Sequence, residues 1–170
     1  MKSLLTQQTG FYRTHMTRRQ QFVGHLHQHQ RLIHSLCRSY FANNEDREDA
    51  FQEIVLQLWK SYPSFRGSSS ISTWMYRVAL RTIFNLLKQR RLTFATLPEQ
   101  LADDNAKDTE LIRAALSQLN PSERALLILY LEGYSYQEIS QIQEMTLTNV
   151  STRLNRIRQK LRSRFQSEMI

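Results

Sequence analysis

Several residue types are scarce in this chain of 170 residues, and each scarcity excludes a class of protein. The single cysteine, Cys37, can form no disulfide within the chain, which suits a reducing compartment. Four glycines, three prolines and no sustained strand-type alternation predict an all-α fold. No apolar run approaches the ~18 residues of a bilayer span. The N-terminus lacks the apolar stretch of a signal peptide. We therefore expect a soluble, cytoplasmic protein.

Sequence motifs for catalysis and metal binding are scarce as well. The chain has no nucleophile–base constellation and no phosphate-binding loop, so we expect no enzyme, no small-molecule substrate and no cofactor. His25 and His29 would share a helix face, but no Cys, Asp or Glu stands near them to complete a metal site. Cys37 lies in an apolar run and is expected to be a small buried core residue.

Positive charge is abundant and unevenly placed. The formal net charge is +8 and the sequence pI is about 10, which favours a polyanionic partner, nucleic acid first and an anionic membrane second. The basic residues form two acid-free segments, 77–91 and 153–164, with an acidic stretch at 103–110 between them. This placement indicates two parts that bind nucleic acid.

The stretch 134–164 predicts two helices and a tight turn, the layout of a helix-turn-helix DNA reader. No Asp or Glu occurs between Glu144 and Glu168, and the polar face of the second helix carries Asn, Ser, Thr and Arg, which can bind base edges and phosphates. The expected buried stripe comprises Val150, Leu154, Ile157 and Leu161. Packing between the two helices is expected from Leu147, Val150, Leu154, Ile139 and Ile142.

Local signals define the helix ends around this motif. Asn120 is a candidate N-cap with Pro121 in the first turn, and Gly133 is a candidate C′ residue that ends the same helix. Ser135 and Glu138 form a capping-box pattern for the next helix. A helical pattern also covers 109–119. Residues 92–108 have weak periodicity and predict a flexible linker that could reach about 60 Å when extended.

The N-terminal half predicts helices at 17–41, 45–60 and 73–90, with a serine-rich loop at 63–72 and a cap from Ser72 or Thr73. The second helix begins with an acidic cluster, which is either N-terminal capping or a docking surface for a basic partner. Glu53 extends the acidic face past the first turn and favours docking. In the third helix, aromatic and basic residues interleave, as in proteins that bind single strands. Trp74 and Tyr76 fit that role or a core role equally well.

Two blocks of this sequence resemble the bacterial RNA polymerase sigma factors. The resemblance to region 2 lies in the segments DAFQEI (from Asp49), LQLW, SFRG, STWMYRVA and KQRR. The resemblance to region 4 lies in LSQLNPSERALLILYLEGYSYQEIS and TLTNVSTRLNRIRQKLR. Only these two regions are present, joined directly, which is similar to the extracytoplasmic-function (ECF) group of sigma factors. The resemblance implies two small helical domains and a promoter-specificity subunit. The implied organisation is a flexible N-terminus (1–16), region 2 (17–91), the linker (92–108), region 4 (109–165) and a tail (166–170).

The resemblance also implies residue roles and partners. Those implied to bind the clamp helices of the largest polymerase subunit are Asp49, Gln52, Glu53, Leu56 and Trp59. Those implied to hold the melted minus-ten strand are Phe65, Arg66, Ser68, Ser69, Ser70, Trp74, Tyr76, Arg77, Arg81, Asn85 and Lys88. Those implied to enter the major groove at minus thirty-five are Thr148, Asn149, Ser151, Thr152, Arg153, Arg156 and Arg158. Further implied partners are the polymerase beta flap and an anti-sigma factor, which could hold the protein near the inner membrane.

Some positions depart from the family pattern. Glu144 stands where the turn of the helix-turn-helix usually carries glycine, and a positive φ there would cost about 1 kcal/mol. Arg81 stands at a usual Asn and Asn85 at a usual Asp, so the minus-ten preference cannot be carried over. The alternative function is a stand-alone helix-turn-helix regulator, which explains 109–165 but neither the acidic helix 45–60 nor the serine loop.

Overall fold

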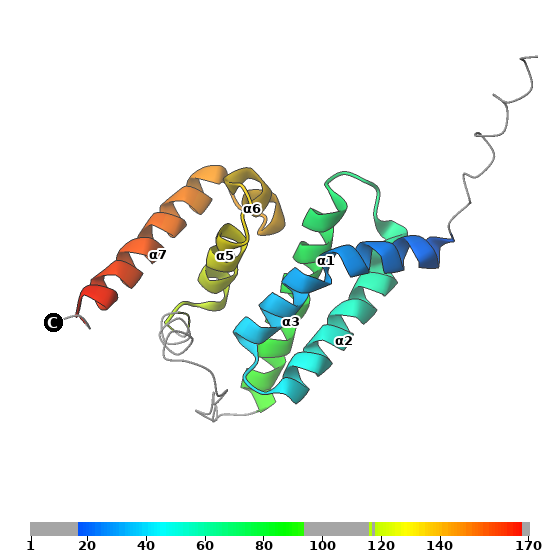
Figure 1. Cartoon of the computed structure of the whole chain (residues 1–170), viewed down its shortest axis with the longest axis horizontal. Helices are drawn as coiled ribbons and strands as arrows, with labels where there is room; N and C mark the ends of the chain where they lie inside the picture. Colours follow the sequence, from blue (N-terminus) through cyan, green and yellow to red (C-terminus); the bar gives the residue numbers. More distant parts are fainter. Residues whose placement is uncertain (1–16, 94–115, 117, 168–170) are drawn as a thin grey trace, which may run out of the picture.

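The computed structural model describes residues 17–93, 116 and 118–167, and every regular element in these ranges is helical (Figure 1). The all-α prediction is confirmed. The elements are α1 (Arg18–Tyr40), α2 (Asn44–Ser61), the short 3₁₀ helix η1 (Tyr62–Ser64), α3 (Ile71–Thr93), α5 (Pro121–Leu131), α6 (Tyr136–Ile142) and α7 (Leu147–Ser167). The predicted N-terminal segment, most of the predicted linker and most of the helix predicted at 109–119 lie outside the described residues.

The first bundle consists of α1, α2 and α3, which all pack against one another. Large apolar side chains from each helix are buried in its core, among them Ile33, Leu36, Ile54, Leu58, Met75 and Ile83. Cys37 is buried among them as predicted, and this burial raises the pKa of its thiol to about 11. The bundle presents outward one face of α2 and one face of α3.

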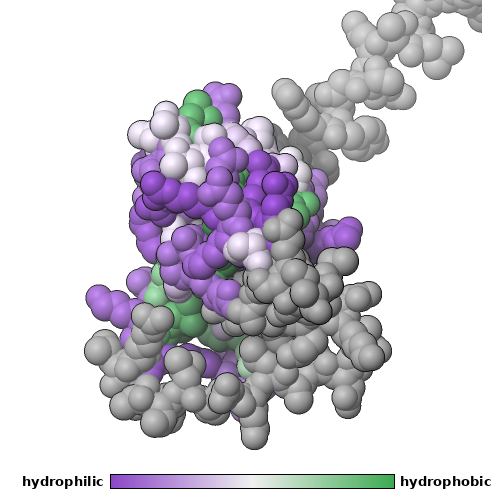
Figure 2. Space-filling view, turned by 90° about the vertical axis from the view of Figure 1, so that its left-hand side faces the viewer, coloured by the Kyte–Doolittle hydropathy of each residue, from purple (hydrophilic) through white to green (hydrophobic). Residues whose placement is uncertain are grey.

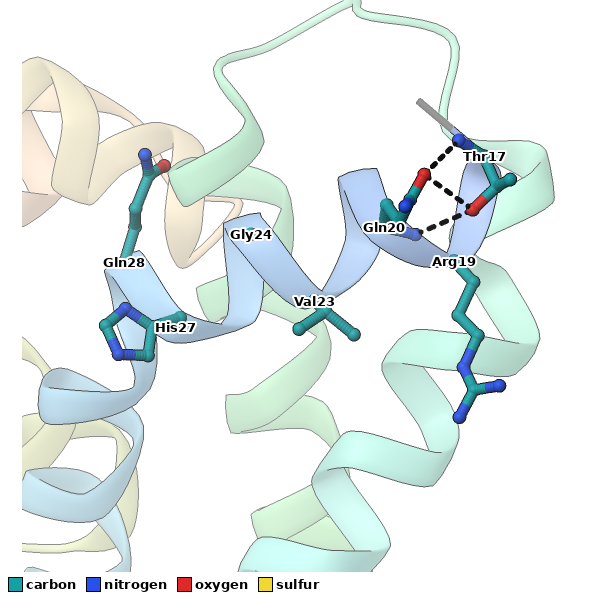
Figure 3. A pocket seen from close by; sticks show the side chains of 7 residues that line it. All are labelled: Thr17, Arg19, Gln20, Val23, Gly24, His27 and Gln28. Carbon is teal, nitrogen blue, oxygen red and sulfur yellow. Dashed lines mark hydrogen bonds between the residues drawn. The ribbon is translucent and has the colours of Figure 1, made fainter. Parts of the chain in front are cut away.

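Side-chain caps fix where these helices begin. Thr17 and Gln20 form a capping box at the start of α1, beside a shallow hollow that exposes Val23 and Gly24 (Figure 3). The prediction that Ser72 or Thr73 caps the third helix is wrong. Ser70 is the cap, because its hydroxyl oxygen accepts a hydrogen bond from the backbone N–H of Thr73 at 3.1 Å and α3 already begins at Ile71.

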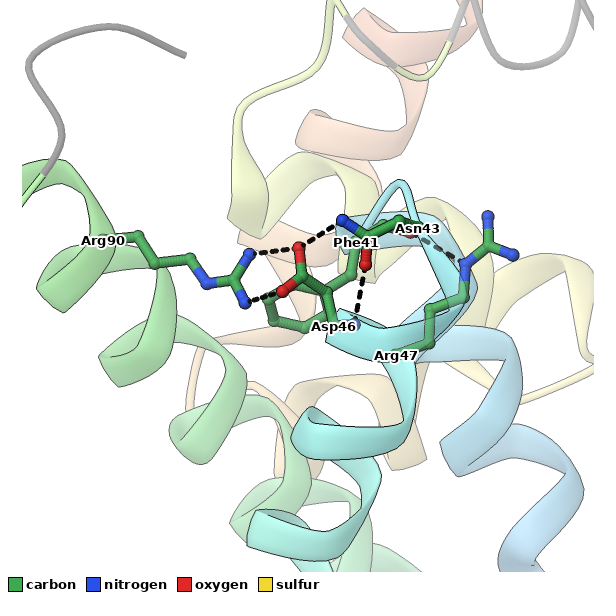
Figure 4. A network of polar contacts seen from close by, with 5 residues as sticks. All are labelled: Phe41, Asn43, Asp46, Arg47 and Arg90. Atoms are coloured by element: carbon green, nitrogen blue, oxygen red, sulfur yellow. Dashed lines mark hydrogen bonds and ion pairs between the residues drawn. The ribbon is translucent and has the colours of Figure 1, made fainter. Parts of the chain in front are cut away.

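An ion pair joins the C-terminal part of α3 to the start of α2 (Figure 4). The Arg90 guanidinium donates to both carboxylate oxygens of Asp46, and it lies 5.1 Å from the centre of the Phe41 ring. Hydrogen bonding from Arg90 lowers the pKa of Asp46. Asn43 caps α2 by accepting from the Asp46 backbone N–H at 2.7 Å. Arg90 therefore has a structural partner, unlike Lys88, whose side chain is exposed.

The second bundle consists of α5, α6 and α7, and its predicted caps are confirmed. Asn120 and Glu123 form a capping box with Pro121 in the first turn, and Ser135 with Glu138 forms another. Gly133 has φ 89°, and the backbone N–H of Tyr134 reaches the Leu129 carbonyl, which closes α5 with a Schellman motif.

Three of the four residues of the predicted apolar stripe of α7 are buried, and the fourth, Leu161, is half-buried. Val150, Leu154 and Ile157 are buried together with Ile139 and Ile142 of α6, as predicted. Leu147, however, is 52% exposed, so its predicted packing on α6 is wrong. Leu147 is the first residue of α7, and helical side chains lean toward the N-terminus. Its side chain therefore extends past the start of the helix rather than over α6.

Candidate functional site

The outer face of α2 combines carboxylates with exposed apolar surface. Asp49 and Gln52 are exposed, while Glu53 is half-buried and accepts a hydrogen bond from the Gln57 side chain at 2.7 Å. Leu56 is 43% exposed and Trp59 is 41% exposed, so two large apolar side chains are accessible on the same face. The five predicted clamp-binding residues thus share one open helix face, suited to a partner that offers both basic and apolar groups.

The loop between η1 and α3 leads directly into the aromatic start of α3. The Phe65 and Trp74 ring centroids are 5.3 Å apart, and Trp74 also lies 6.1 Å from Tyr62. Arg66 and Ser68 are exposed, whereas Ser69 is half-buried. Ser70, one of the predicted strand-binding residues, has its hydroxyl in the cap of α3. The loop therefore presents a basic and hydroxyl-bearing rim next to a cluster of tilted aromatic rings.

Tyr76 is only 2% exposed and lies where the two bundles meet. Its ring packs edge-on against Tyr134 of the second bundle, with centroids 5.5 Å apart. Its hydroxyl lies 2.9 Å from Nδ1 of His29 on α1. Burial raises the pKa of the Tyr76 phenol and lowers the pKa of His29. In this arrangement Tyr76 is a buried residue, and its ring is not accessible to a nucleic-acid base.

The two arginines that follow it also contact the second bundle. Arg77 donates to the Gln141 carbonyl oxygen at 2.7 and 3.2 Å, and its Nε lies 3.4 Å from a carboxylate oxygen of Glu144. Arg81 lies 3.6 Å from the other oxygen of Glu144. Asn85 and Lys88, further along the same predicted set, are exposed. The predicted strand-binding surface is therefore divided into an open loop, a covered centre and an open end.

Glu144 forms the turn between α6 and α7 with φ 53°. Without glycine at this position, either the turn has a different geometry or Glu144 adopts the strained backbone conformation. The positive φ shows that Glu144 adopts the strained conformation. Apart from glycines, it is the one described residue with positive φ. The backbone cost for a residue with a Cβ atom is about 1 kcal/mol.

The α7 residues predicted to enter a major groove lie outside its buried stripe, on both sides of it. Thr148, Asn149, Thr152 and Arg156 are exposed, and Ser151 and Arg153 are half-buried. The guanidinium of Arg158 lies 4.7 Å from the centre of the Tyr130 ring, so Arg158 also helps to hold α7 on α5. Figure 2 views the side of the molecule that carries α7, and its described surface is mostly hydrophilic.

A second contact between the bundles was not predicted from the sequence. The Tyr40 hydroxyl donates to the Pro121 carbonyl oxygen at 2.5 Å, and Arg124 donates to the Ser39 carbonyl oxygen at 2.7 Å while its guanidinium lies 5.3 Å from the centre of the Tyr40 ring. Burial raises the pKa of Tyr40 and lowers that of Arg124. The partners are more than 80 positions apart, so no local pattern could have found them.

Within the described ranges, no group of three or more His, Cys, Asp or Glu side chains is placed to hold a metal ion. None of the described helices is long and apolar enough to span a bilayer.

Two family models match the chain, in the order expected from the sequence. Sigma-70 region 2 matches residues 26–93, and Sigma-70 region 4 matches residues 109–161. The first match covers α3 and most of the first bundle. The second covers α5, α6 and much of α7, and also residues outside the described part of the chain.

Curated relatives agree with these matches. RNA polymerase sigma factor YlaC of Bacillus subtilis is 32% identical over 133 residues, which cover 69% of this chain and 76% of YlaC. The ECF RNA polymerase sigma-E factor of Haemophilus influenzae is 26% identical over 99% of this chain and 100% of its own. ECF sigma factor SigG of Mycobacterium tuberculosis is 35% identical, but the aligned part spans only 28% of SigG.

Two solved structures share the fold at low sequence identity. The sigma factor RpoE of Bartonella quintana, in complex with the anti-sigma factor NepR, has a TM-score of 0.74 and 19% identity, over 86% of this chain and 97% of the other. CnrH, in complex with the cytosolic domain of CnrY, has a TM-score of 0.69 and 18% identity, over 89% of this chain and 90% of CnrH. With both regions matched in order and YlaC alike over most of its length, the chain belongs to the ECF group of the sigma-70 family of RNA polymerase sigma factors.

Proposed function

We propose that this protein binds core RNA polymerase and directs it to start transcription at specific promoters. The observation that carries the proposal is the open face of α2, where Leu56 and Trp59 are exposed beside carboxylates in the part of the chain that matches Sigma-70 region 2. DNA binding alone does not require such a face, so its presence favours a polymerase subunit over a stand-alone DNA-binding regulator. A polymerase subunit needs one, because its DNA-binding parts act only when they are attached to the enzyme.

Polymerase binding is assigned to α2, with Asp49, Glu53 and Trp59 at its centre. Aromatic and apolar side chains with an accessible surface give most of the affinity in such interfaces, and surrounding charges set the orientation. In the second bundle, Leu131 is 71% exposed and Leu147 is also exposed. We assign these two side chains to the polymerase beta flap.

DNA binding is assigned to both bundles. The exposed Thr148, Asn149, Thr152 and Arg156 of α7 would contact duplex DNA, with arginine suited to guanine edges and phosphates. The loop at 65–70 and the adjacent rings would hold bases of the melted strand. Unstacking a base costs a few kcal/mol, and stacking on an aromatic ring returns about 1–3 kcal/mol. No covalent change in the DNA is involved.

Restraint by an anti-sigma factor is a further part of the proposal. Both solved structures described above are complexes, RpoE with the anti-sigma factor NepR and CnrH with the cytosolic domain of CnrY. We expect this protein to act in the cytoplasm, where polymerase and promoters meet. A membrane-bound anti-sigma factor would hold it at the inner membrane until a signal arrives.

Run-off transcription tests the proposed function. Purified protein is added to core polymerase and fragments of genomic DNA, and new transcripts are mapped at their 5′ ends. Discrete starts that share upstream elements are expected with the protein and not without it. If polymerase shows the same starts with and without the protein, the proposal is wrong.

A further inference from the structure

The two bundles close over part of the surface that the proposed function assigns to promoter DNA. Tyr76, Arg77 and Arg81 of α3 all contact the second bundle. We propose that this closure is autoinhibitory, with the Glu144 carboxylate acting as a clasp in the position where α3 would otherwise bind a DNA phosphate. The inference rests on the proposed function for the assignment of α3 to DNA, but the closure itself can be measured without polymerase.

The backbone at Glu144 supports a role for its side chain. A glycine would adopt the φ of 53° without a Cβ penalty, so the turn alone gives no reason for glutamate. The carboxylate, in contrast, reaches two cations of the other bundle, Arg77 at 3.4 Å and Arg81 at 3.6 Å. The strain is thus coupled to an interaction that only an acidic side chain provides.

Arg77 also donates to a second acceptor in the second bundle. The Gln141 carbonyl that accepts two of its N–H groups belongs to the last turn of α6, the negative end of the helix. A guanidinium binds a phosphate best through two parallel N–H donors. Because those donors are directed to Gln141 and Glu144, Arg77 cannot bind a phosphate in the same way until α6 moves away.

The clasp biases the closure rather than creating it. Both ion pairs with Glu144 are partly exposed, so each is weak and is screened by salt. The less exposed contacts, Tyr76 against Tyr134 and Arg124 with Ser39, place the bundles. A chain that is mostly closed binds DNA through α3 with an affinity reduced by the fraction that is open. A polyanion that competes for Arg77 and Arg81 would therefore favour the open form.

The test compares the full chain with Glu144→Gln, which removes the charge and keeps the backbone strain. The matched control is Glu48→Gln, the same charge change at an exposed site on α2. The radius of gyration is measured by small-angle scattering, and the affinity for a fluorescein-labelled oligothymidine by anisotropy at low salt. We expect Glu144→Gln to increase the radius of gyration and to bind about threefold to tenfold more tightly than the control, as two exposed ion pairs allow. The difference should shrink with added salt.

Glu144→Gly gives a second variant that relieves the strain and should open in the same way. The proposal is wrong if both variants bind the oligonucleotide no more tightly than Glu48→Gln, whether or not their radius of gyration changes. Run-off transcription with wild-type protein separates this outcome from a failure of the proposed function. Tighter binding without promoter-directed transcripts would support the clasp and contradict the proposed function, and the reverse result would do the opposite.

Discussion

The two proposed binding faces of the first bundle differ in accessibility. The α2 face is open, with Leu56 and Trp59 exposed, while the centre of the α3 face lies against the second bundle, with Tyr76 at 2% exposure. Both faces belong to one small core and are fixed relative to each other. The difference indicates an order of events, because the proposed polymerase face of α2 is accessible while the bundles are closed, whereas the covered centre of α3 can contact DNA only after they separate. Four experiments can break or sharpen this comparison.

The largest effect is expected from reversing one charge on the open face. Glu53→Arg should weaken binding to core polymerase roughly 100-fold, since a like charge facing the basic clamp helices costs several kcal/mol. Bio-layer interferometry with immobilised core polymerase measures the loss. Glu48→Arg has the same charge change on the same helix and should lose much less affinity. Equal losses in the two variants would show that only net charge matters and that the α2 face is not the docking site.

A smaller effect is expected from the contact that joins α1 to α5. Arg124→Ala leaves the partly buried Ser39 carbonyl without its donor and removes the guanidinium from the Tyr40 ring. The free energy of unfolding should fall by about 2 kcal/mol, as measured by urea denaturation. Tyr40→Phe removes only the hydroxyl that donates to Pro121 and should cost about 1 kcal/mol. An unchanged free energy of unfolding in Arg124→Ala would mean that the bundles do not pack together in solution.

The third effect is a pH dependence of stability next to the covered face. Burial lowers the pKa of His29 below its usual value of 6.5, so the folded state favours the neutral ring. The unfolded chain then binds the proton more readily, so the stability from this residue is complete above pH 6.5 and is lost as pH falls from that value through the lower pKa of the folded state. His29→Gln should flatten the decrease in melting temperature between neutral and acidic pH. The same decrease in wild type and variant would assign it to other groups.

The smallest effect is expected at the C-terminal end of α3, which stays open. Lys88→Gln should weaken oligonucleotide binding slightly and reduce the slope of log affinity against log salt by about 1, because one phosphate contact is lost. Arg90→Gln should leave that slope unchanged, since Arg90 is paired with Asp46. It should instead lower the unfolding free energy by less than about 1 kcal/mol. Equal salt slopes for both variants would remove the distinction between them.

The sequence was a good guide wherever a structural cause is local. The caps at Asn120 and Ser135 and the C′ glycine at Gly133 depend on residues a few positions apart, so their patterns can be read directly. The buried stripe of α7 follows from its period. The presence of glutamate instead of glycine at position 144 was also visible as a departure from the family pattern. The ion-pair partners of Glu144 were not visible in the sequence.

The errors and omissions come from contacts that the local pattern does not contain. The choice between Ser70 and Ser72 as the cap depends on how the loop enters α3, and both serines fit the sequence rule. Leu147 has the right period but lies at the end of its helix. Tyr40 and Arg124 meet only because the bundles pack together, and a tyrosine near a helix end carries no signal for that. Tyr76 fitted a core role and a base-stacking role equally well for the same reason.

Cys37 limits how this protein could take part in oxidative signalling. It is the chain's one cysteine, it is buried in the first bundle, and its pKa is raised to about 11. Oxidants and disulfides react with the thiolate, which is a very small fraction of such a group at neutral pH. Peroxide would therefore leave the folded chain chemically unchanged at this residue. If transcription directed by this protein responds to oxidants through a thiol, Cys37 in the folded chain is not expected to be that thiol.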